Sequence, residues 1–313
     1  MTARHLVRGV VAAVTLLAVG QPGIAARGRQ APPAAKTPPA QDTATQVLRK
    51  TCRAADGVTL VYSVAGKGEP ALLFIHGGMA DRSFYEPQLK ALSGRWRVIA
   101  LDLAGHGESS ANRTTWGIPE FGKDVKAVAD AEGLKRVIVF GNSLGGPVAV
   151  EAALLLPGRA IGVVGIDTFQ DLGQPRTPER EREEAAFFRT RAEAFRADYP
   201  AAMREMVKML FHRDADAALM ADVERRMLKT PASVASATLA GLVGYQQDEA
   251  VRRLVVPLRA INGDLYPTDA KAARTVKPDF DVILMKHMGH YPMLERPDEF
   301  NRHVAAVVAE LTK

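Results

Sequence analysis

Residues 136–156 constrain the fold more than any other segment, because an apolar strand, a glycine-rich turn and an apolar helix follow one another directly. The strand is expected over 136–140, and the helix over 146–156 is stopped by Pro157 and Gly158. A fully apolar strand that leads into an apolar helix is typical of a parallel sheet with helices on both faces. The segment therefore predicts an α/β protein.

The same alternation continues through most of the chain. Further strands are expected over 58–64, 71–75, 97–101, 161–166, 254–261 and 281–285, and further helices over 121–132 and 297–311. Residues 169–250 interrupt it: they contain no convincing strand, but a charged run at 179–184 and an amphipathic segment at 201–211 predict helices. The charged run is expected to be a solvated helix face. We expect a mostly parallel sheet built from 51–168 and 251–313, with 169–250 inserted as a helical cap.

The first 26 residues have the composition of an export signal. Basic residues precede an apolar run at 10–19, and small residues follow at 23–26. The run is shorter than the roughly 20 residues that span a bilayer comfortably. We expect cleavage near Ala25 or Ala26, no stable membrane span afterwards, and a periplasmic or secreted protein; an uncleaved anchor is the alternative.

Residues 27–50 are rich in Pro and Ala, and they are expected to form a disordered linker because they cannot bury enough apolar surface to fold. Residues 1–50 contain seven Lys and Arg and one acid, which accounts for the whole formal charge of +6. Residues 51–313 therefore sum to zero and give no support for a nucleic-acid surface. With Cys52 as the single cysteine, an internal disulfide is impossible.

The turn between the strand and the helix at 136–156 carries a candidate nucleophile. Ser143 lies at the centre of the pattern Gly141-x-Ser143-x-Gly145, where glycines relieve the crowding of a tight turn. The serine would stand exposed at the start of the helix. A serine hydroxyl is a weak nucleophile unaided, so a base has to lie within hydrogen-bond reach.

The remaining parts of such a site are also present. His290, after the last expected strand, is the candidate base, and His287 is its competitor nearer the strand end. An oxyanion hole needs backbone N–H groups aimed at the developing charge. Leu144, directly after the serine, would supply one, and Gly78, in the loop after strand 71–75, would supply the other, with Met79 as an alternative.

Four motifs resemble the α/β-hydrolase superfamily over residues 55–313. They are His76-Gly77-Gly78, the loop Asp102 to Ser109, Gly141 to Gly146, and Gly289-His290 followed by Glu295, Pro297 and Phe300. The resemblance implies a capped member with a serine nucleophile, similar to esterases and lipases. It also implies the chain order nucleophile, acid, histidine.

The acid departs from the usual pattern of this family. The family commonly places it three residues past a Gly after the strand that follows the cap, but the residue three past Gly263 is Tyr266, and Asp264 comes too early. Some lipase-like members carry the acid after the preceding strand, where Asp167 stands. The sequence leaves Asp167 and Asp264 as alternatives.

The expected reaction is hydrolysis of an ester-type bond in a small molecule through an acyl-enzyme, without metal or organic cofactor. A carboxylic ester hydrolase is the default class. The resemblance argues against epoxide hydrolases and haloalkane dehalogenases, which carry an aspartate at the position of Ser143. A peptidase similar to proline iminopeptidases and a non-hydrolytic small-molecule-binding protein remain alternatives.

Overall fold

The computed structural model describes residues 46–313, so the predicted export signal and most of the predicted linker lie outside the described residues. An eight-stranded sheet in the order β1-β2-β4-β3-β5-β6-β7-β8 forms the centre of the molecule. Its strands are β1 (Leu48–Arg53), β2 (Thr59–Ala65), β3 (Ala71–Ile75), β4 (Val98–Leu101), β5 (Val137–Asn142), β6 (Ala160–Ile166), β7 (Leu258–Gly263) and β8 (Asp281–Met285). β2 runs antiparallel to both of its neighbours, and the other adjacent strands are parallel.

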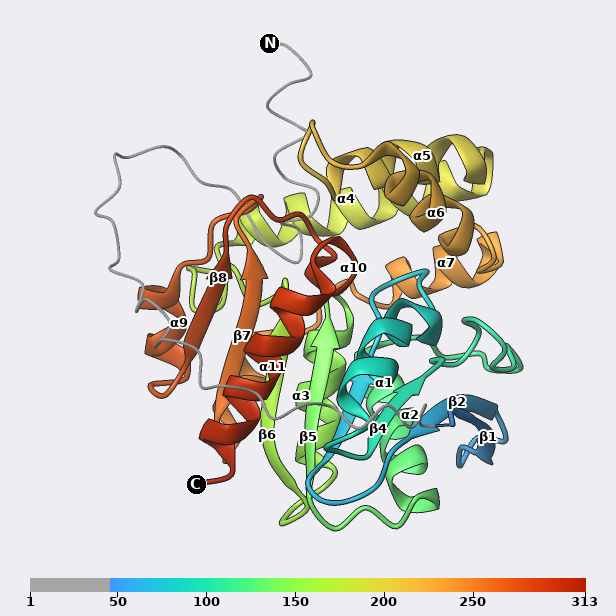
Figure 1. The fold of residues 1–313 in the computed structure, drawn as a ribbon. Coiled ribbons are helices and arrows are strands. Elements are labelled where there is room, and N and C mark those ends of the chain that lie inside the picture. Colours follow the sequence, from blue (N-terminus) through green and yellow to red (C-terminus); the bar gives the residue numbers. More distant parts are fainter. Residues whose placement is uncertain (1–45) are drawn as a thin grey trace.

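Helices cover both faces of this sheet, as the alternation in the sequence predicts (Figure 1). The helices of the core are α1 (Glu86–Leu92), α2 (Ile118–Ala131), α3 (Gly145–Leu154), α8 (Gln247–Arg252), α9 (Ala270–Val276), α10 (Pro292–Glu295) and α11 (Pro297–Leu311). α1 contacts α11 on one face, and α2 contacts α3 on the other. β3, β4 and β5 are entirely buried between the two layers, which explains their unbroken apolar sequences. The predicted fold class is confirmed.

The cap lies at one end of the sheet. Its helices are α4 (Pro178–Ala197), α5 (Tyr199–Met209), α6 (Ala217–Met227) and α7 (Ala232–Ala240). They lie between β6 and β7 in the chain and above the carboxyl ends of the parallel strands (Figure 1). Ligands of open α/β sheets bind at this edge, so the cap covers the position where a site is expected. No helix within residues 46–313 combines the length and apolarity needed to cross a membrane.

Two expectations from the sequence need correction. The predicted linker extended to residue 50, but β1 begins at Leu48; this edge strand is held by backbone pairing with β2 and has little apolar signal. The charged run at 179–184 is only partly solvated. Arg180 and Glu184 are 16% and 19% exposed and bond to Asp171 and Arg176, respectively, at the base of the cap.

Candidate active site

Ser143 occupies a strained turn between β5 and α3. Its φ angle of 51° lies in the left-handed region, which L-residues rarely adopt. A Cβ at Gly141 would lie 1.9 Å from the carbonyl oxygen of Gly145, and one at Gly145 would lie 2.5 Å from that of Ile75. Both positions therefore require glycine, and the turn places Ser143 in the lining of a cavity beneath the cap.

Asp167 follows β6 and contacts the candidate base directly. Its Oδ2 lies 2.5 Å from Nδ1 of His290, and its Oδ1 accepts a hydrogen bond from the backbone N–H of Gly263 at 3.1 Å. Both Asp167 and His290 are buried. Burial from water and the second bond to Gly263 fix the carboxylate against the imidazole, which fixes the orientation of the ring.

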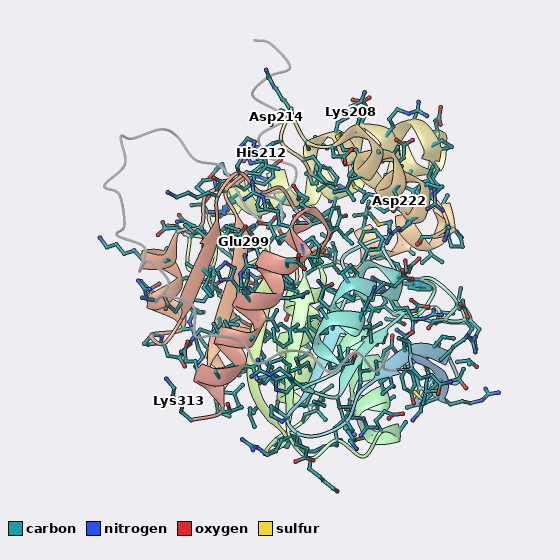
Figure 2. The ribbon with its side chains drawn as sticks, in the orientation of Figure 1. Lys208, His212, Asp214, Asp222, Glu299 and Lys313 are labelled. Atoms are coloured by element: carbon teal, nitrogen blue, oxygen red, sulfur yellow. The ribbon has the colours of Figure 1, made fainter. Side chains whose placement is uncertain are left out.

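Asp264 lies in a different environment, and the structure does not bring it to His290. Its Oδ1 accepts from the backbone N–H of Met288 at 3.1 Å and lies 3.2 Å from Nε2 of His212. The competitor histidine, His287, is exposed and pairs with Asp214 at 3.0 Å. Figure 2 labels His212 and Asp214 beside the cap, above the strand ends. These groups form a surface cluster, so the geometry favours Asp167 as the partner of His290.

The loop that carries His290 is anchored on both sides. The backbone N–H of His290 donates to the carbonyl of Leu210 in the cap at 2.8 Å. The Glu295 carboxylate accepts from the N–H groups of Gly289 and Tyr291, which flank the histidine, and burial raises the pKa of Glu295. From the sequence, Glu295 was expected only as part of the motif that follows His290.

Asn142 is a site residue that the sequence analysis missed. Its Nδ2 donates to the carbonyl of Ile166 at 2.9 Å and to the carbonyl of His290 at 3.0 Å. One amide group therefore ties the residue before Ser143 to the end of β6 and to the histidine loop. The variable position between Gly141 and Ser143 in the motif gave no signal for this function.

Two loops present free backbone donors near the serine. Among residues 46–313, no hydrogen bond uses the N–H of Gly78 or of Leu144, and the N–H of Met79 is equally free. His76 braces this loop: its Nδ1 donates to the carbonyl of Gly77 at 2.7 Å and its Nε2 accepts from the N–H of Leu103 at 3.0 Å. Burial lowers the pKa of His76, which agrees with a neutral ring in this position.

A cavity lies between the cap and the strand ends. Ser143, Leu144, His290, Tyr291 and the loop from Gly77 to Met79 line its floor, and cap residues form the rest of its wall. The cap residues are Phe187, Phe188, Arg191, Met206, Leu210, Met227, Thr238, Leu239 and Leu242. The cavity is therefore mainly apolar, as is usual for small-molecule sites. Within the described residues, no group of three or more His, Cys, Asp and Glu side chains could hold a metal ion.

The parallel sheet, the inserted cap and the serine turn together define the architecture of an α/β hydrolase. The sequence profile of the alpha/beta hydrolase family matches residues 72–303. The chain belongs to this family, which confirms the resemblance in its motifs.

Individual relatives match the chain over shorter segments. It is 34% identical over 108 residues to the dihydrolipoyllysine-residue acetyltransferase component of the acetoin cleaving system of Cupriavidus necator, covering 34% of this chain and 29% of that protein. It is 37% identical over 120 residues to epoxide hydrolase B of Mycobacterium tuberculosis, covering 36% and 34%. The matches thus span about a third of each relative.

Solved structures resemble the chain over most of its length. A thermophilic esterase from Thermogutta terrifontis has a TM-score of 0.73 at 22% identity and covers 86% of this chain and 100% of its own. The enol-lactonase from Burkholderia xenovorans has a TM-score of 0.71 at 20% identity and covers 83% and 100%. At these identities the likeness concerns the fold alone.

Proposed function

We propose that this protein is a serine hydrolase that cleaves an ester-type bond of a small molecule through an acyl-enzyme intermediate. One observation carries the proposal: His290, which is paired with the buried Asp167, lines the same cavity as Ser143, and Ser143 stands on a strained turn. A nucleophile, a base and an acid that orients the base are the parts that acyl transfer requires.

In the proposed mechanism, the Ser143 oxygen attacks the ester carbonyl carbon while Nε2 of His290 takes its proton. The negative charge on the former carbonyl oxygen is stabilised by the N–H groups of Gly78 and Leu144. The histidine then protonates the leaving alcohol, which yields the acyl-enzyme. A water molecule, deprotonated by His290, releases the carboxylic acid and regenerates the serine. Throughout, Asp167 holds Nδ1–H and stabilises the imidazolium.

The nature of the nucleophile separates ester from epoxide chemistry. One relative is named an epoxide hydrolase, but the residue at the turn of this chain is Ser143 rather than the aspartate that the sequence analysis associates with epoxide hydrolases. Serine suits attack on an acyl carbon, where the tetrahedral intermediate is stabilised by backbone N–H groups. Ester hydrolysis is therefore proposed ahead of epoxide opening.

The proposal is tested with a fluorophosphonate probe and with p-nitrophenyl acetate, using Ser143→Ala as the control. We expect the probe to label the wild type at Ser143, p-nitrophenol to be released, and both signals to disappear in the variant. Turnover of styrene oxide without labelling would instead indicate epoxide chemistry. Release of N-terminal proline from peptides would indicate a peptidase. If the probe does not label the protein and no substrate is turned over, the protein is a binding protein.

The export of the protein is a second part of the proposal, and it rests on the composition of residues 1–26. We expect the mature protein in the periplasm or the medium, beginning near residue 27. Cell fractionation combined with mass spectrometry of the mature N-terminus tests this. Recovery of the full-length chain from the membrane fraction would favour the uncleaved anchor.

A further inference from the structure

The wall of the catalytic cavity contains one arginine. Arg191 lies on α4 in the cap and lines the same cavity as Ser143 and His290. Apart from the histidine, the other side chains of that wall are neutral, and most are Phe, Met or Leu. A permanent positive charge is therefore placed in a mainly apolar chamber above the nucleophile.

This arginine has no protein partner among residues 46–313. No hydrogen bond or ion pair involves its guanidinium, which lies over the ring of Phe187 at 5.4 Å. The carboxylate of Glu205 acts on it only through space, since it already pairs with Lys208 at 2.7 Å on the exposed side of α5.

Other partly buried arginines of the cap region are paired. Arg176 lies 2.9 Å from Glu184, Arg180 lies 3.0 Å from Asp171, and Arg226 lies 2.5 Å from Asp222. The partly buried arginines of the cap region therefore form ion pairs with acidic side chains, and Arg191 is the exception. Burial lowers the pKa of Arg191, as expected of a cation whose desolvation is only partly offset by the distant carboxylate of Glu205.

We propose that Arg191 binds a carboxylate of the substrate, so that the preferred substrate is an ester or lactone with a carboxylate separated from the scissile bond by an apolar spacer. The proposal rests on the proposed function of Ser143. The planar guanidinium can hold a carboxylate through two parallel hydrogen bonds. The apolar lining between Arg191 and the strand ends fits the spacer, and the low polarity of the wall strengthens the ion pair.

Matched pairs of substrates test this assignment. One member of each pair is the mono-p-nitrophenyl ester (hemiester) of glutaric, adipic or suberic acid, which keeps a free carboxylate. In the other, neutral member, that carboxylate is converted to a methyl ester and the p-nitrophenyl ester is unchanged. For the best spacer we expect the wild type to favour the hemiester in kcat/KM by about 10- to 100-fold, the range of a charge-assisted hydrogen bond. In Arg191→Met the ratio should fall to about one, and Arg191→Lys should keep part of it.

A control variant separates a local contact from the general charge of the cap. Arg189 lies on the same helix but is exposed and does not line the cavity. Arg189→Met should keep the wild-type ratio, whereas an equal loss in both variants would show long-range attraction and overturn the proposal. Retained fluorophosphonate labelling of Arg191→Met shows that the site is intact.

Failure of this proposal and failure of the proposed function give different results. A wild type that is labelled by fluorophosphonate and hydrolyses neutral esters without preference for the hemiesters overturns only the role of Arg191. A wild type that is not labelled overturns the proposed function. In that case, calorimetry of suberate binding to the wild type and to Arg191→Met tests whether Arg191 binds a carboxylate, and it needs no turnover. Equal binding to both proteins, or no binding to either, overturns the role of Arg191.

Discussion

The α/β core and the helical cap hold their polar side chains in different ways. Around the candidate site in the core they bond largely to the backbone: Asp167 accepts the N–H of Gly263, and Nε2 of His76 accepts the N–H of Leu103. Away from the site, the core also contains ion pairs such as the buried pair of Arg113 with Asp124. In the cap region the charged side chains bond mainly to one another, as in the pairs of Arg176 with Glu184 and of Arg225 and Arg226 with Asp222.

This difference has a physical consequence. A side chain that bonds to a particular backbone group must stay at one position of the chain, because the strand ends and turns set where that group lies. An ion pair between two side chains can be replaced by another pair one turn along a helix with little change in free energy. The backbone contacts of the candidate site therefore require particular residues at particular positions, whereas the ion pairs of the cap helices permit other sequences.

The largest effect that sharpens this comparison is expected at Asp167. In Asp167→Asn an amide would present its NH₂ group to Nδ1 of His290, which forces the proton onto Nε2 and prevents the ring from accepting the serine proton. We expect kcat for p-nitrophenyl acetate to fall by about 10⁴-fold. Steady-state kinetics measures this loss, and thermal unfolding checks that the variant is folded.

Asp264→Asn is the matched variant at the other strand end. Its carboxylate is 42% exposed and bonds to Met288 and His212 rather than to His290. We expect a change in kcat of no more than about threefold, because no interaction of the proposed triad is altered. Similar losses in both variants would contradict the assignment of the acid.

A smaller effect is expected at Asn142, which joins two backbone carbonyls within the core. Asn142→Ala leaves the carbonyls of Ile166 and His290 without this donor, so we expect about 1–3 kcal/mol loss of unfolding free energy. It also frees the histidine loop, and kcat should fall by about 10-fold. Asn262→Ala is the control, since Asn262 bonds to the backbone of Thr168 and not to His290. It should lose stability with a smaller loss of kcat; equal losses would mean that Asn142 acts through stability alone.

The sequence predicts the core better than the cap for the same reason. The apolar strands, the glycines that the Ser143 turn requires and the family of the chain were all evident, because packing and backbone geometry permit few alternatives. The acid stayed open because strand ends meet only in the fold: Asp167 and His290 are 123 positions apart. β1 was missed because its exposed, polar sequence is held by backbone pairing with β2. Neither the pairing of Arg180 nor the isolation of Arg191 follows from composition or spacing.

The buried charges of the cap region predict a pH dependence of stability. Burial from water raises the pKa of Asp171 to about 7, with the acids Glu184 and Asp248 adding to the effect and the arginines at 180 and 176 opposing it. Since the folded pKa lies above the unfolded value near 4, protonation stabilises the folded state. This stabilisation is full below pH 4 and is lost as the pH rises through 7.

Asp171→Asn removes this titration. As the pH is raised from 5 to 8, the wild type loses this stabilisation and the variant does not. The unfolding free energy of the variant should therefore rise by about 2 kcal/mol relative to that of the wild type. Chemical denaturation of both proteins at the two pH values measures the difference. A difference that does not change with pH would show that Arg180 keeps Asp171 ionised throughout this range.

The smallest effect is expected on the solvated side of the same charged run. Arg182 and Glu179 pair at 2.8 Å but are 71% and 74% exposed, so water and salt screen them. Arg182→Ala should change the unfolding free energy by no more than about 0.5 kcal/mol. Arg176→Ala should lower it by about 1–3 kcal/mol, because Glu184 is left without its partner at the base of the cap. Equal effects would show that burial does not distinguish the two pairs, and the unpaired state of Arg191 would then lose its significance.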